Sequence, residues 1–207
     1  MPKENSMNKY ALVIGVSDHE GANGAGDAQL VTGVLRSASY DIHRLIGRKA
    51  TREAIYQEFD WLRGIQNEDS KVVIFWSSHG TYGSIAGYQC LFPVLYLAEE
   101  FSDFISKHQA MMFCGCRCGS LIVELNPSPP PLYVPTELCT DNRLIVTAAG
   151  YGGLPEPYKQ YTKWGWFFVH EGLAKGMSIQ KSHQYAKDNL HGRGGLISDN
   201  YGSEFFL

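Results

Sequence analysis

The chain has 207 residues, of which 44% are hydrophobic and 19% are charged, and this length and composition predict one globular domain with a full core. Its formal net charge is −3 and its 18 Lys and Arg residues form no run, which excludes a general nucleic-acid binder because phosphate binding relies on clustered basic side chains. Residues 1–8 are polar and no segment approaches the roughly 20 apolar residues of a membrane span, so we expect a cytoplasmic protein without a membrane partner.

Strand and helix patterns alternate through the first half of the chain. Residues 10–16 form an apolar run that ends near glycine, which is typical of a parallel strand buried on both faces. A glycine-rich turn follows, and the next patterns predict a helix over 27–37, a strand over 40–46, and a helix from its N-cap Thr51 to about Gly64.

Two further apolar runs each end on a reactive side chain. Residues 72–78 lead to His79 and residues 109–115 lead to Cys116, with an amphipathic helix over 97–105 between them. In an open α/β sheet the carboxyl ends of the strands border one crevice, so we expect the imidazole and the thiol to face the same pocket.

The second half begins with a proline-rich segment at 126–131, which predicts an exposed loop. Beyond it, the patterns predict a strand over 143–148, a helix over 164–175 closed by Gly176, a helix over 179–190 and an edge strand over 203–207. The alternation of strands and helices predicts an α/β class with a doubly wound, mostly parallel sheet.

The five cysteines are an odd number, and three of them, Cys114, Cys116 and Cys118, lie two residues apart. Neighbours at this spacing are poorly placed for an unstrained disulfide, so we expect reduced thiols. No Cys-x-x-Cys pair occurs and no histidine lies beside the three, so we expect neither a metal nor another cofactor.

Residues 77–80 read Ser-Ser-His-Gly and residues 114–119 read Cys-Gly-Cys-Arg-Cys-Gly. These segments resemble the Ser-Gly-His-Gly and Asp-x-Cys-x-Ser-Gly motifs of the caspase-like cysteine proteases, the group of caspases, metacaspases and prokaryotic caspase homologues. Shorter matches occur in the same order at 26–28, 91–93, 165–168 and 171–173.

The resemblance implies a three-layer fold over residues 9–207, with a six-stranded, mostly parallel sheet between two helical layers and a tail at 1–8. It also implies that the proline-rich loop over 121–142 separates a large-subunit-like part from a small-subunit-like part. The partners implied are peptide or protein substrates.

The motifs imply a Cys/His pair that hydrolyses peptide bonds through a thioester. A thiolate attacks the carbonyl carbon, and the leaving amine then needs a proton. By the resemblance, Cys116 is the nucleophile, His79 is the general acid and base, and the N–H groups of Gly80 and Cys116 form the oxyanion hole. Two alternatives stay open: an inactive relative that binds peptides or partner proteins, and a flavodoxin-like ligand-binding domain.

The resemblance also bears on the substrate. Metacaspases, which cut after Arg or Lys, place two acidic residues in the primary pocket, and the matching positions here are Asp27 and Cys114. One carboxylate remains, so we expect cleavage after a basic residue. Arg117 and Arg143 are the candidates for binding an acidic residue instead.

The loop over 121–142 bears on activation. Residues 119–142 contain no Lys or Arg, so a peptidase specific for basic residues could not cleave itself there. We therefore expect the intact chain to be active, or a regulatory protein or larger effector chain to activate it. Many metacaspases need calcium, but no acidic cluster with calcium-binding spacing is visible in this sequence, so a calcium requirement stays open.

Overall fold

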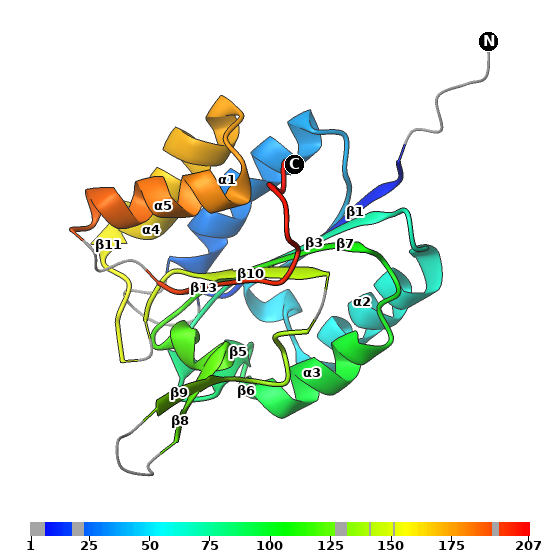
Figure 1. Cartoon of the computed structure of the whole chain (residues 1–207), viewed down its shortest axis with the longest axis horizontal. Helices are drawn as coiled ribbons and strands as arrows, with labels where there is room; N and C mark the ends of the chain where they lie inside the picture. Colours follow the sequence, from blue (N-terminus) through cyan, green and yellow to red (C-terminus); the bar gives the residue numbers. More distant parts are fainter. Residues whose placement is uncertain (1–6, 18–22, 127–131, 141, 151, 192–194) are drawn as a thin grey trace.

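The computed structural model describes residues 7–17, 23–126, 132–140, 142–150, 152–191 and 195–207. A six-stranded sheet forms its centre (Figure 1). The strand order is β13 (Ile197–Asp199), β10 (Arg143–Thr147), β7 (His108–Cys114), β3 (Lys71–Ser77), β1 (Lys9–Gly15) and β2 (Asp41–Ile46). All neighbouring pairs are parallel except β10 and β13. The prediction of a mostly parallel six-stranded sheet is confirmed.

Helices cover both faces of this sheet (Figure 1). On one face lie α1 (Gly24–Ser37) and α5 (Ile179–Asn189), and on the other lie α2 (Arg52–Ile65) and α3 (Val94–Ser102), with the short helix η1 (Gly47–Lys49) before α2. The Thr51 hydroxyl accepts the N–H of Ala54 at 3.2 Å, so the predicted N-cap of α2 is confirmed. None of the described helices is long and apolar enough to cross a lipid bilayer.

The helix predicted over 164–175 is present but not uniformly α-helical. It starts as α4 (Lys163–Gly165), continues as the π-helix η3 (Trp166–Gly172) and ends in the 3₁₀ turn η4 (Leu173–Lys175). Gly176 closes it with a φ of 80°, a left-handed conformation that suits glycine.

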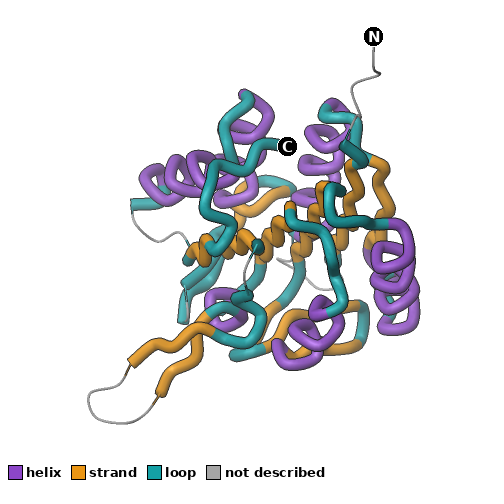
Figure 2. Tube along the Cα trace, turned by 45° about the vertical axis from the view of Figure 1, so that its right-hand side comes forward, coloured by secondary structure: helices purple, strands orange, loops and turns teal. Residues whose placement is uncertain are grey.

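Three small antiparallel sheets were not predicted, the last of them the hairpin of β11 (Pro157–Tyr158) and β12 (Tyr161–Thr162). The first follows His79 directly and consists of β4 (Gly80–Thr81), β5 (Ser84–Gly87) and β6 (Cys90–Pro93). The second is the hairpin of β8 (Val123–Asn126) and β9 (Leu132–Pro135), which projects from the body of the protein (Figure 2). It occupies part of the segment predicted as a loop, and prolines 127 and 129–131 lie outside the described residues.

The predicted edge strand over 203–207 is wrong, because β13 fills that position in the sheet. The segment is instead held by tertiary hydrogen bonds around the buried Phe205, which is 1% exposed. The Phe205 N–H donates to Oε1 of Gln180 at 3.0 Å, and its carbonyl accepts the N–H of Ile179 at 2.8 Å. A strand-like composition was overridden by packing against the start of α5.

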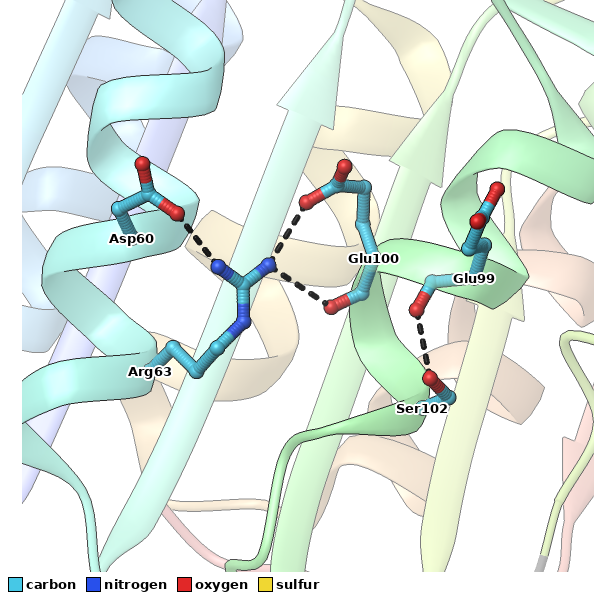
Figure 3. Close-up of polar contacts among 5 residues, drawn as sticks. All are labelled: Asp60, Arg63, Glu99, Glu100 and Ser102. Atoms are coloured by element: carbon cyan, nitrogen blue, oxygen red, sulfur yellow. Dashed lines mark hydrogen bonds and ion pairs between the residues drawn. The ribbon is translucent and has the colours of Figure 1, made fainter.

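An arginine links α2 and α3, which cover the same face of the sheet (Figure 3). Arg63 of α2 contacts the Asp60 carboxylate at 2.5 Å and the Glu100 carboxylate of α3 at 2.7 Å. Its side chain is 29% exposed, so each ion pair contributes about 1 kcal/mol at most. The contact supports the packing of α2 on α3 and lies away from the strand ends that carry the reactive residues.

Candidate active site

The predicted histidine and cysteine follow the ends of two neighbouring strands. In the parallel pair β3 and β7, Ser77 lies opposite Cys114, and the Ser78 N–H donates to the Cys114 carbonyl at 2.9 Å. His79 and Cys116 each lie two residues beyond this matched pair. The strand register therefore brings both partly exposed residues to the same edge of the sheet, as predicted.

The loops after these strands touch backbone to backbone. A Cβ atom at Gly80 would lie 2.2 Å from the carbonyl oxygen of Cys116 and 3.5 Å from its nitrogen, while a Cβ atom at Gly115 would lie 2.7 Å from the carbonyl oxygen of Ser78. Glycine is therefore required at position 80 by the Cys116 backbone. Gly80 and Cys116 are thus neighbours, and their role as oxyanion donors stays a prediction.

The backbone immediately after Cys116 is held in an uncommon conformation. Arg117 has a φ of 56°, and its N–H donates to the carbonyl of Gly153 at 2.7 Å. The 3₁₀ turn η2 (Cys118–Leu121) follows, and the Ser120 N–H donates to the Arg117 carbonyl at 2.9 Å. The Arg117 guanidinium lies 4.5 Å from the ring centre of Tyr82. Its contact with an acidic substrate residue stays a prediction.

The two cysteines that flank Cys116 are buried. Burial raises the pKa of both the Cys114 and Cys118 thiols, which makes them poor nucleophiles. The Cys118 sulfur accepts the N–H of Ala149 at 3.3 Å, so it packs as a structural side chain. All five cysteines lie among the described residues and are free thiols, as predicted.

Asp27 lies fully buried in the first turn of α1. The hairpin of β11 (Pro157–Tyr158) and β12 (Tyr161–Thr162) brings Thr162 to it, and the Thr162 N–H donates to Oδ1 of Asp27 at 3.0 Å. Three side chains donate to Oδ2: Ser77 Oγ at 2.9 Å, Thr162 Oγ1 at 3.0 Å and Cys114 Sγ at 3.4 Å. Loss of solvent raises the pKa of Asp27 to about 6.

The structure therefore brings Asp27 and Cys114 together, but in this conformation neither is open to solvent. Their predicted role in substrate binding stays a prediction. Sequence analysis missed the other two members of the cluster, Ser77 and Thr162. They lie 50 and 135 residues from Asp27, and no local pattern marks such a contact.

The prediction that Arg143 could bind a substrate is wrong. Arg143 is the first residue of β10 and pairs with Gln109 near the start of β7, at the opposite end of the sheet from His79 and Cys116. Its side chain is buried and donates to Gln109 Oε1, the Leu138 carbonyl and the Phe101 carbonyl at 2.9–3.1 Å. Burial lowers its pKa to about 10, which still leaves it charged at neutral pH.

We expect Arg143→Met to destabilise the fold by about 3 kcal/mol, because it leaves buried acceptors without their donor. This corresponds to a drop of about 6–12 °C in the unfolding midpoint followed by circular dichroism. The exposed Arg48→Met is the matched control and should shift the midpoint by about 2 °C at most. A stable Arg143→Met protein with altered peptide preference would contradict this structural role.

Within the described ranges, no group of three or more His, Cys, Asp and Glu side chains is arranged to hold a metal ion. A thiol, an imidazole and closely packed backbone at one sheet edge are the components of a cysteine nucleophile site.

Comparisons with known proteins give a family and, among solved structures, many chains of similar fold. The family model described as "Caspase domain" matches residues 8–125, more than half of the chain, and this range includes His79 and Cys116. The crystal structure of protein GSU0716 from Geobacter sulfurreducens has a similar fold, with a TM-score of 0.72 and 10% sequence identity. The match covers 96% of this chain and 97% of that one. No curated protein sequence gives a significant match.

Proposed function

Because this chain belongs to the caspase-domain family, we propose that it is a cysteine endopeptidase in which Cys116 and His79 carry the reaction. The observation that carries the proposal is the register of β3 and β7. It matches Ser77 with Cys114, so the two reactive residues leave adjacent strands at equal distance from the last paired position. Neither residue alone would support the proposal, since single histidines and cysteines at strand ends are often structural.

The reaction proceeds in two stages. The Cys116 thiolate adds to the carbonyl carbon of the scissile bond, and backbone N–H groups of Gly80 and Cys116 stabilise the negative oxygen. The C–N bond then breaks, the His79 imidazolium gives its proton to the leaving amine, and a thioester remains. In the second stage His79 takes a proton from water, the resulting hydroxide attacks the thioester, and the C–S bond breaks to release the acid product and restore the Cys116 thiolate beside the His79 imidazolium.

The proposed substrate is a peptide or protein, and the proposed compartment is the cytoplasm, where free thiols stay reduced. The preference for a basic residue stays a prediction, because it rests on Asp27 and Cys114. A second candidate is a peptide-binding relative without activity. It is favoured by the closed contact between those two side chains, where metacaspases have two acidic residues available to the substrate.

Selective alkylation tests the function directly. With iodoacetamide or a peptide chloromethyl ketone at neutral pH, we expect Cys116 to react at least about tenfold faster than the other four thiols, as measured by mass spectrometry. Cys90 and Cys139 are the matched comparators because they are also partly exposed. The same protein should hydrolyse members of a fluorogenic peptide library. Equal reactivity at all three partly exposed thiols, with no hydrolysis, would favour the binding module.

A further inference from the structure

We propose that Asp27 is a positioning residue that locks together the two strand ends carrying His79 and Cys116. The inference rests on the proposed function and gives Asp27 a role other than contact with a substrate side chain. Oδ2 of Asp27 accepts from Ser77 and from Cys114. Each donor lies two residues ahead of a proposed reactive residue, so one carboxylate oxygen fixes the ends of both strands.

A third segment joins the same carboxylate. Thr162 donates its N–H to Oδ1 and its hydroxyl to Oδ2, each at 3.0 Å. The Thr162 hydroxyl oxygen also accepts the N–H of Gly165 at 2.9 Å and so caps the helix that starts at Lys163. The carboxylate therefore links β3, β7 and the start of this helix within one buried cluster.

The cluster is tightly packed and closed to solvent, with Asp27 0% and Cys114 1% exposed. A Cβ atom at Gly165 would lie 2.3 Å from Oδ1 of Asp27, and a Cβ atom at Gly24 would lie 2.2 Å from the Ser77 carbonyl oxygen. A buried carboxylate is stable only when donors surround it, and four donors meet this one. Pairing with a basic substrate side chain would require the protein to give up hydrogen bonds that already satisfy the carboxylate.

Cys114 fits this role because its thiol remains protonated. Burial and the nearby Asp27 charge raise its pKa, so the sulfur keeps a hydrogen to donate. It is the only titratable side chain among the described residues that hydrogen-bonds to Asp27. A second carboxylate here would repel the first, whereas a thiol can bridge to it.

A pair of substitutions at Cys114 tests the proposal. Cys114→Ser keeps a donor for Asp27, whereas Cys114→Ala removes it. Positioning predicts that kcat falls at least about tenfold in Cys114→Ala, with KM unchanged, and that Cys114→Ser retains more activity. If Cys114 only filled space, the serine hydroxyl would bring no gain, and Cys114→Ala would retain at least as much activity as Cys114→Ser.

The Asp27→Asn variant gives the second measurement. We expect kcat to fall at least about tenfold on all peptides, whatever residue precedes the cut site. A loss confined to a higher KM for Arg and Lys substrates would overturn the proposal and make Asp27 a specificity residue. Unchanged kinetics on every substrate would overturn it as well.

Hydrogen exchange separates this proposal from the proposed function. Exchange of peptides covering residues 77–80 and 114–117 should be faster in Asp27→Asn and Cys114→Ala than in the wild type, and close to the wild type in Cys114→Ser. If the wild type hydrolyses no peptide, the proposed function fails and exchange alone decides the positioning role. Unchanged exchange in both Asp27→Asn and Cys114→Ala would then overturn it.

The pH dependence of stability provides an independent check on the buried carboxylate. The pKa of Asp27 is about 6 in the folded protein against 3.8 in an ordinary setting, so the unfolded chain loses this proton first as pH rises. The wild type should therefore lose stability relative to Asp27→Asn between about pH 4 and pH 6. Unfolding midpoints that stay parallel across this range would contradict a buried, ionising Asp27.

Discussion

The Cys116→Ala variant is expected to lose at least about 10³-fold in kcat/KM on peptide substrates, because alanine cannot form the thioester. Its unfolding midpoint should stay within about 2 °C of the wild type, since Cys116 is partly exposed and the change removes one atom. The measurement is hydrolysis of a fluorogenic peptide, combined with thermal unfolding of the same preparation.

Cys139→Ala is the matched control. Cys139 is also a partly exposed thiol, with its sulfur donating to the Ile122 carbonyl at 3.3 Å, and we expect its replacement to leave hydrolysis near the wild-type rate. His79→Ala should be nearly as inactive as Cys116→Ala, and the double variant should be no worse than either, because the two groups act as one unit. Hydrolysis by Cys116→Ala at the parental rate would end the peptidase proposal.

The main elements of the sheet could be predicted because parallel strands buried on both faces are continuous apolar runs. Residues 72–78 and 109–115 contain enough apolar side chains in sequence to mark β3 and β7 within one or two residues. The edge strand was misplaced for the same reason. The real edge strand β13 has only three residues, Ile197–Asp199. The composition of residues 203–207 is more apolar and therefore more typical of a strand.

Short elements and irregular helices carried too little local signal. Strands β4, β5 and β6 have two to four residues each, so periodicity cannot identify them. The segment Trp166–Gly172 has an ordinary helical pattern, and nothing in that pattern marks its π-helical form. Local sequence therefore predicts that a helix is present but not its hydrogen-bonding pattern.

The candidate site was likewise predicted only in part. His79 and Cys116 could be found because each ends an apolar run, and strand order then fixes their common edge. The contacts of Asp27 with Ser77 and Thr162 are tertiary. The sequence therefore identified the acidic residue but not its burial or the hydrogen-bond donors around its carboxylate. Arg143 failed as a candidate because it is the first residue of its strand, whereas the site lies at the carboxyl ends of the parallel strands.

Replacing Gly80 with alanine tests the closest backbone contact in the site. The added Cβ atom would lie 2.2 Å from the Cys116 carbonyl oxygen, a separation that real Cβ contacts essentially never show. The obstacle is backbone, so one of the two loops has to move. A displacement of about 1 Å at the reacting groups costs about 10²-fold in rate, and we expect Gly80→Ala to lose at least that much in kcat.

The control for this substitution is Gly64→Ala. Gly64 lies exposed in α2, and the Cβ atom that alanine adds there would meet no neighbouring heavy atom within 4 Å, so this variant should keep full activity and gain slightly in stability. Both variants add the same methyl group, and only the one at position 80 presses on the backbone of the proposed nucleophile. Wild-type kcat in Gly80→Ala would show that the contact between the His79 and Cys116 loops does not set the geometry of the reaction.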